Sequence, residues 1–148
     1  MQKISKGARG FTLIEILVVI GIIAILATIV IIAINPARQF AQANNTQRTS
    51  NVNTILNAVG QELADNKGVF NAGVCVGVSL PSATTHIGTA LGVDLTCLTP
   101  TYVTAIPFDP TTGSNGDTQY TIVASSTSGR ITVAAEDAEL GQSISVTR

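Results

Sequence analysis

The chain has 148 residues with eight lysine or arginine and nine aspartate or glutamate side chains, which gives a formal net charge of −1. This length fits a single domain. The basic side chains that follow Gly10 are dispersed, so no patch signals binding to nucleic acid; they are Arg38, Arg48, Lys67, Arg130 and Arg148.

The first predicted element is a membrane-spanning helix over residues 11–34, a stretch that is uncharged except for Glu15. A helix of this length extends ~36 Å, enough to cross a hydrocarbon core of about 30 Å. The apolar run exceeds the roughly 7–15 residues of a secretory signal peptide, so we expect no cleavage after it. Lys3, Lys6 and Arg9 precede the span and predict a single pass with the N-terminus inside the cell.

Glu15 is the one acidic residue in this span. An ionised side chain within a bilayer costs at least a few kcal/mol, so Glu15 is expected to have a partner. The natural partner is a positive charge on another copy of the chain. The sequence therefore predicts a membrane-inserted precursor that assembles.

Residues 6–20 read Lys-Gly-Ala-Arg-Gly-Phe-Thr-Leu-Ile-Glu-Ile-Leu-Val-Val-Ile and closely resemble the class III leader and N-terminal helix of type IV pilins and type II secretion pseudopilins. The resemblance covers about the first thirty residues. It implies cleavage between Gly10 and Phe11 by a prepilin peptidase, followed by N-methylation of Phe11. It also implies that Glu15 pairs with the N-terminal amine of a neighbouring subunit. A plain signal anchor is the alternative, but it leaves the Gly10-Phe11 junction unexplained.

A second helical segment is expected over residues 35–68. Pro36 lacks an amide donor and its ring blocks the preceding turn, so a kink or unwinding is expected over residues 32–35. Gly68 can provide a left-handed C-cap. Residues 42–51 are almost wholly polar and are expected to be solvated or loosely packed. Beyond them, apolar residues recur at helical spacing and predict a face packed on a core: Val52, Ile55, Leu56, Val59 and Leu63.

Residues 69–148 are expected to form a head of loops and antiparallel strands. Apolar residues alternate at period two in three segments: Tyr120, Ile122 and Ala124, then Ile131, Val133 and Ala135, then Ile144 and Val146. Residues 126–129 fit a hairpin turn. The predicted fold class is α+β, with a long N-terminal helix packed on a small antiparallel sheet. This is also the plan of the pilins, and it divides the chain into a cleaved leader (1–10), a filament-core helix (11–34), its continuation (35–68) and the head (69–148).

Cys75 and Cys97 are the two cysteines and both lie on the predicted exterior side of the membrane. Outside the cytoplasm, an even pair in a loop-rich head favours a disulfide, which would contribute about 3 kcal/mol. Two buried reduced thiols are the alternative.

Asp109, Asn115 and Asp117 offer oxygen ligands of the kind that calcium prefers. Their spacing lacks the full pattern of an EF-hand, and Pro110 with the nearby glycines already explains a turn. A turn is the favoured interpretation, and no metal or other cofactor is predicted.

An enzyme is not predicted. His86 is the sole histidine, with no acid nearby in the sequence, and we expect it to be a lone surface residue. The serines and threonines form no recognised nucleophile motif.

These features predict the structural subunit of a type IV pilus-like filament. It would be made as a membrane prepilin, cleaved after Gly10 and polymerised through its hydrophobic helix. The expected partners are other copies in a homopolymeric filament, the prepilin peptidase, the cytoplasmic membrane and the pilus assembly platform. The assembled subunit would lie at the cell surface.

Two alternatives stay open, a pseudopilin of a type II secretion or DNA-uptake system and a membrane-anchored adhesion or binding head. Residues 106–110 are similar to a Pro-x-Asp-Pro segment of major pseudopilins, whereas the loop between the cysteines is more pilin-like.

Overall fold

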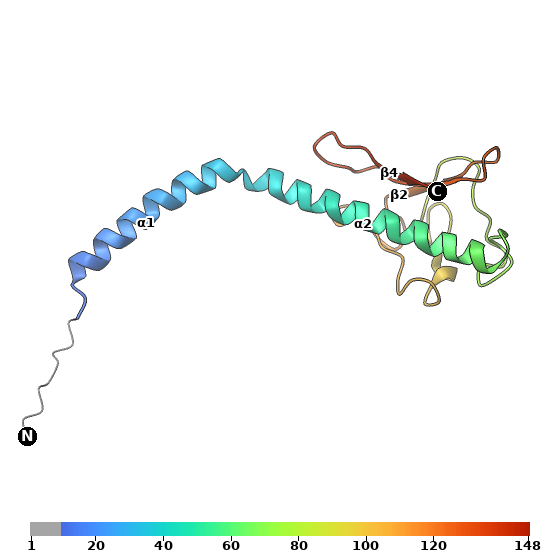
Figure 1. Cartoon of the computed structure of the whole chain (residues 1–148), viewed down its shortest axis with the longest axis horizontal. Coiled ribbons are helices and arrows are strands. Elements are labelled where there is room, and N and C mark those ends of the chain that lie inside the picture. The colour runs from blue at the N-terminus through green and yellow to red at the C-terminus, as the bar shows by residue number, and fades with distance from the viewer. Residues whose placement is uncertain (1–9) are drawn as a thin grey trace, which may run out of the picture. The chain divides into compact units, whose positions relative to one another are not determined.

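The computed structural model describes residues 10–148, so residues 1–9 of the predicted leader, with Lys3, Lys6 and Arg9, lie outside the described residues. The contacts divide the chain between Gln39 and Phe40 into two compact units. The first holds a long apolar helix, and the second holds a helix with a small sheet (Figure 1).

Helix α1 spans Leu13–Ile34 and ends where Asn35 adopts a left-handed conformation, with φ of 47°. Asparagine tolerates this conformation better than most residues do. Pro36 then opens the next helix, where its missing amide donor is not required. The break therefore falls inside the expected range of residues 32–35, and that prediction is confirmed.

Helix α2 spans Pro36–Asp65 and packs the predicted apolar face inward, with Val52, Ile55 and Val59 fully buried. Beyond its last turn, the amide of Gly68 donates to the carbonyl oxygen of Leu63 at 2.7 Å. Gly68 has φ of 86°, a left-handed conformation that glycine adopts without steric cost. The predicted glycine cap is confirmed.

The polar part of α2 differs from expectation. Residues 42–51 were predicted to be solvated or loosely packed, yet Asn45, Arg48 and Asn51 are buried. Each finds a polar partner in the head; for example, the Asn51 amide donates to the hydroxyl oxygen of Tyr120 at 2.9 Å. A pattern of apolar residues cannot reveal a helix face that is buried through hydrogen bonds.

The sheet has four antiparallel strands in the order β1-β2-β3-β4. They span Thr85–His86, Tyr120–Ala124, Ile131–Ala135 and Ile144–Thr147. The last three match the predicted strands, while the two-residue β1 is too short to leave a periodic signal. The turn at residues 126–129 closes the β2–β3 hairpin, because the amide of Gly129 donates to the carbonyl oxygen of Ser125 at 2.9 Å.

The core of the second unit lies between α2 and the sheet (Figure 1). Tyr120, Ile122 and Val133 are fully buried in one cluster with the apolar face of α2. The α+β arrangement, a long N-terminal helix with a small antiparallel sheet, is confirmed.

Candidate processing and assembly site

The Gly10-Phe11 junction lies immediately before the first helix. Gly10 and Phe11 are outside regular secondary structure, and the Phe11 side chain is 81% exposed. The chain becomes helical only at Leu13. The predicted scissile bond is therefore held in an accessible segment at the helix entrance.

Thr12 and Glu15 form a capping box at the start of α1. The Glu15 amide donates to the hydroxyl oxygen of Thr12 at 3.2 Å, and the Thr12 amide donates to the Glu15 carboxylate at 3.4 Å. This fold-back holds the carboxylate at the helix N-terminus, where the helix dipole favours negative charge. Thr12 was not predicted, although the Thr-x-x-Glu pattern before an apolar run was a usable signal.

Helix α1 has an apolar surface on all sides. None of its residues is buried, and Leu13, Ile22 and Ile32 each have more than half of their surface exposed. Among the described residues it is the helix long and apolar enough to cross a membrane. A helix that is apolar all round needs lipid or other helices around it.

Arg48 on α2 holds the polar side of the head together. Its guanidinium donates to both carboxylate oxygens of Asp109, at 2.6 and 3.1 Å, and to Glu139 at 2.7 Å. Asn45, one turn earlier, donates to the backbone oxygen of Glu139 at 2.8 Å. Arg48 therefore ties α2 to the loop before β2 and to the loop before β4.

Asp109 serves this structural pair and a turn. Its carboxylate accepts the amide hydrogen bonds of Thr111 and Thr112 at 2.9 and 3.2 Å. Burial by itself would raise the pKa of Asp109, but the hydrogen bonds from Arg48 and Thr111 outweigh it and lower that pKa. The carboxylate is thus ionised and engaged, in agreement with the favoured turn interpretation.

Asp117, the second acid of the calcium alternative, is engaged elsewhere. It lies 3.0 Å from the Nδ1 atom of His86. Among the described residues no group of three His, Cys, Asp or Glu side chains could hold a metal ion. The two acids of the calcium alternative are therefore engaged in separate contacts, Asp109 with Arg48 and Asp117 with His86.

His86 is not the lone surface residue that was expected. It lies between two acids. The Asp117 carboxylate is 3.0 Å from the Nδ1 atom of His86, and the Glu136 carboxylate is 3.6 Å from its Nε2 atom. The hydrogen bond to Asp117 raises the pKa of His86 against a smaller opposing effect of burial. These acids are 31 and 50 positions away in the sequence, so only the pairing of β1 with β2 brings Asp117 near.

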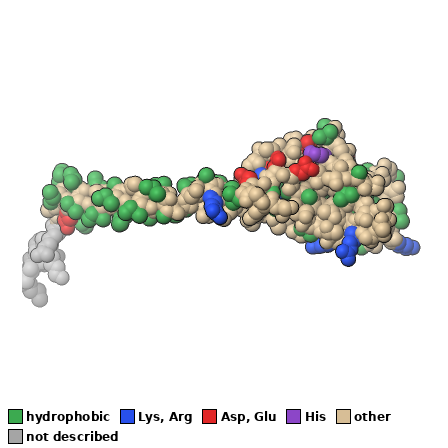
Figure 2. Space-filling view, turned by 90° about the horizontal axis from the view of Figure 1, so that it is seen from above, with side chains coloured by type: hydrophobic (Ala, Val, Ile, Leu, Met, Phe, Trp, Pro, Cys, Tyr) green, Lys and Arg blue, Asp and Glu red, His purple; other side chains and the backbone are tan. Residues whose placement is uncertain are grey.

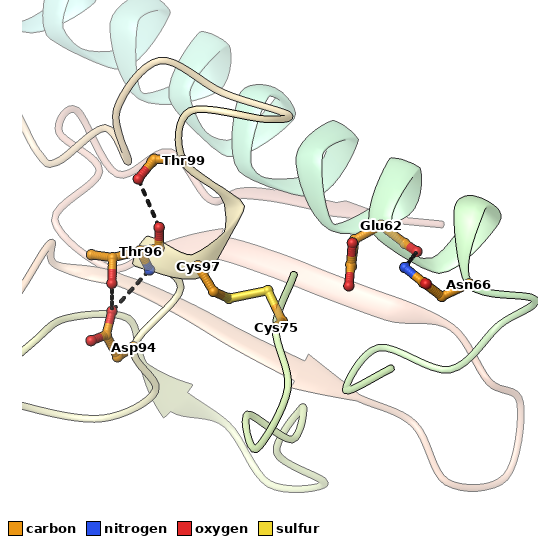
Figure 3. The surroundings of a disulfide bond; sticks show 7 residues. All are labelled: Glu62, Asn66, Cys75, Asp94, Thr96, Cys97 and Thr99. Carbon is orange, nitrogen blue, oxygen red and sulfur yellow. Dashed lines mark hydrogen bonds between the residues drawn. A yellow bond between two sulfur atoms is a disulfide. The ribbon is translucent and has the colours of Figure 1, made fainter. Parts of the chain in front are cut away.

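Cys75 and Cys97 form the predicted disulfide, with their Cα atoms 5.1 Å apart (Figure 3). Cys97 is held in a 3-10 helix, Thr96–Leu98, whose start is fixed by Asp94 accepting the Thr96 amide at 2.8 Å. Glu62 of α2 lies in the same surroundings. The disulfide therefore fastens a long loop beside the C-terminal part of α2.

Comparison with known protein families gives a match for one segment of the chain. Residues 5–31 match the family described as the prokaryotic N-terminal methylation motif. This match covers the Gly10-Phe11 junction, Thr12, Glu15 and most of α1. Searches of curated proteins and of solved structures gave no match.

Proposed function

We propose that this chain, in which residues 5–31 match the prokaryotic N-terminal methylation motif, is a structural subunit of a type IV pilus-like filament. A prepilin peptidase cleaves the precursor between Gly10 and Phe11, and the new Phe11 amine is methylated. The processed chain then leaves the membrane and packs its apolar helix against other copies in the filament core, while the heads form the outer surface.

The exposed apolar surface of α1 is the observation that carries this proposal. In the precursor, lipid can cover that surface, with the basic leader held on the cytoplasmic side. After the leader is removed, helices of other copies can replace the lipid without exposing apolar groups to water. A structural role in the filament follows from this exchange of lipid for helix contacts.

Glu15 sets the register between copies in this proposal. The capping box directs its carboxylate toward the Thr12 amide, one residue from the position of the Phe11 amine. In an apolar filament core, an unpaired carboxylate is costly, and the amine of an incoming copy offsets that cost. Misregistered copies would leave both charges unpaired.

N-terminal sequencing and intact mass of protein sheared from cells test the proposal. A chain that begins at methylated Phe11 in long filaments is the expected result. An intact Met1 leader in the membrane would instead identify a plain anchor.

The role of Glu15 is tested separately with Glu15→Ala and the isosteric Glu15→Gln. Both variants should be processed and inserted normally but should yield few filaments, because each removes the charge. Wild-type yield from Glu15→Gln would refute the charge pairing, since glutamine retains only the hydrogen bond.

A pseudopilin of a secretion or DNA-uptake machine is the second candidate. The Pro107-Phe108-Asp109-Pro110 segment is similar to that of major pseudopilins, and this resemblance favours the second candidate. Processed chain confined to the cell envelope, without sheared filaments, would support this candidate over a major pilin.

A further inference from the structure

The sheet of the head carries opposite charge at its two ends. Strand β3 begins directly after Arg130, and Arg148 lies at the same end because its amide donates to the carbonyl oxygen of Ile131 at 2.9 Å. We call Arg130 and Arg148 the basic end. The acidic end follows β3 and precedes β2 and β4, and its four residues are Asp117, Glu136, Asp137 and Glu139.

The two ends are well separated. The five residues of β3 lie between Arg130 and Glu136, so these two residues are six positions and roughly 20 Å apart at about 3.3 Å per residue. Figure 2 shows acidic side chains gathered around the histidine at one edge of the head and basic side chains along the opposite edge. At the acidic end, Arg48 and, when protonated, His86 are the neighbouring cations, and the carboxylates that they contact outnumber them.

An apolar side chain protrudes beside the acidic end. Leu140 is 48% exposed in the loop between β3 and β4 and has φ of 59°. A left-handed conformation is unfavourable for leucine, and so is exposure of its side chain to water. The isolated head therefore gains nothing evident from a leucine at this position.

An apolar groove lies beside the basic end. It has a volume of about 430 Å³ and is lined by Leu56, Gly60 and Ala64 of α2, by Gly129 of the hairpin turn, by Ile131 of β3 and by Arg148 after β4. A Cβ atom built on Gly60 would meet no atom within 4 Å, so the groove is open over this glycine. Its floor has room for a leucine side chain.

We propose that these two surfaces bind each other in successive copies of the chain. Leu140 of one head enters the groove over Gly60 of the next head, and the acidic end faces Arg130 and Arg148. The contact joins two different surfaces, so each copy keeps one free surface of each kind and the contact can propagate from copy to copy along a filament. Burial of the leucine stabilises the contact, and the charges select its orientation. This inference rests on the proposed function in one respect, that assembly brings copies of the chain next to one another.

Two substitutions test the contact without damaging the head. Leu140→Asn removes the apolar side chain and suits a left-handed backbone better. Gly60→Leu fills the groove and improves helix propensity. Both precursors should be processed normally, but the filament yield should fall at least about tenfold. Burying a leucine side chain stabilises a contact by more than the free energy that corresponds to a tenfold change in its equilibrium constant. Val76→Asn, at a 74% exposed side chain that does not line the groove, is the matched control and should assemble normally.

Charge reversal tests the orientation. Arg130→Glu with Arg148→Glu should lower filament yield, as should Glu136→Lys with Asp137→Lys. All four substitutions in one chain should restore yield, because the two ends are again complementary. Wild-type yield from both Leu140→Asn and Gly60→Leu, or no rescue by the fourfold variant, would overturn the proposal.

Cysteine cross-linking in membranes separates this contact from filament formation itself. A full-length chain with Leu140→Cys and Gly60→Cys should give an oxidation-dependent ladder of multimers, whereas either single variant should stay monomeric because position 140 faces position 60 and not itself. If wild-type chains form no filaments, the proposed function fails, but the ladder still decides the contact. Dimers without a ladder would contradict it.

Discussion

Arg48 on α2 and Asp109 in the loop before β2 form a doubly hydrogen-bonded ion pair whose side chains are 1% and 0% exposed. The two residues are 61 positions apart in the sequence. Their pairing explains why a polar stretch of α2 is buried, because the charge on the helix is matched by a carboxylate that the head supplies.

Removing either partner should destabilise the head strongly. Arg48→Met or Asp109→Ala should lower the free energy of unfolding by about 3–5 kcal/mol, because the first leaves Asp109 without a counter-charge and the second leaves Arg48 with only the partly exposed Glu139. Arg48→Met combined with Asp109→Leu should recover most of that loss. Denaturation of the detergent-solubilised chain, followed by tyrosine fluorescence, measures the effect. The exposed Arg130→Met should change stability by less than about 0.5 kcal/mol, and equal losses in the single and double variants would contradict the pairing.

The same pair predicts sensitivity to acid. Because the pKa of Asp109 is lowered in the folded head, its contribution to stability is fully present above the ordinary value of 3.8 and is lost as the pH falls below it. Unfolding measured from about pH 5 down to about pH 2 should show this decline. Asp109→Asn should weaken the dependence, and an unchanged slope in that variant would assign the decline to other carboxylates.

His86 predicts a second pH dependence of opposite sign. Its pKa is raised in the folded head by Asp117, with smaller contributions from Glu136 and Asp137. The stabilisation is therefore fully present below the ordinary value of 6.5 and is lost as the pH rises through the folded-state value. His86→Gln should lower the free energy of unfolding below that pH, where the wild-type head has this stabilisation, and should flatten the decline as the pH rises above it. A titration of His86 by NMR that shows an unshifted or lowered pKa would contradict this.

The sequence was informative wherever burial is apolar. The spacing of Val52, Ile55 and Val59 predicted the packed face of α2, and the alternation in β2 and β3 predicted the central strands. Both patterns follow directly from side-chain geometry in helices and strands. The break at Asn35 was predictable because a proline inside a helix has a fixed steric consequence.

The polar contacts could not be found in the same way. From the sequence alone, Arg48 is expected to be a solvated helix residue and Asp109 a turn residue. The fold brings the two side chains together. His86 similarly meets Asp117 only through the short pairing of β1 with β2. Such contacts depend on tertiary structure and have no local period in the sequence.

Gly92 should tolerate no side chain. It has φ of 90°, and a Cβ atom there would lie 1.9 Å from the carbonyl oxygen of His86. Gly92→Ala should therefore destabilise the head by about 3 kcal/mol or more, through backbone strain and displacement of β1. Gly129→Ala is the matched control, because Gly129 has φ of 69° but open space around it, and should cost about 1 kcal/mol. Similar losses in both variants would show that steric overlap at Gly92 is relieved by movement.

Glu62 is expected to be a position where stability can be gained. Its side chain is fully buried, and neither carboxylate oxygen has a hydrogen-bond partner within residues 10–148. Tyr102 donates instead to Asp65, at 2.9 Å. Glu62→Met should raise the free energy of unfolding by about 1–3 kcal/mol, the usual cost of an unsatisfied buried polar group.

Glu62→Gln is the informative comparison in the same denaturation experiment. Glutamine has nearly the same shape but keeps a buried polar group, so it should give a smaller gain than methionine. Loss of stability in Glu62→Met would contradict the prediction. It would indicate that the carboxylate contributes a favourable interaction beside the Cys75–Cys97 loop.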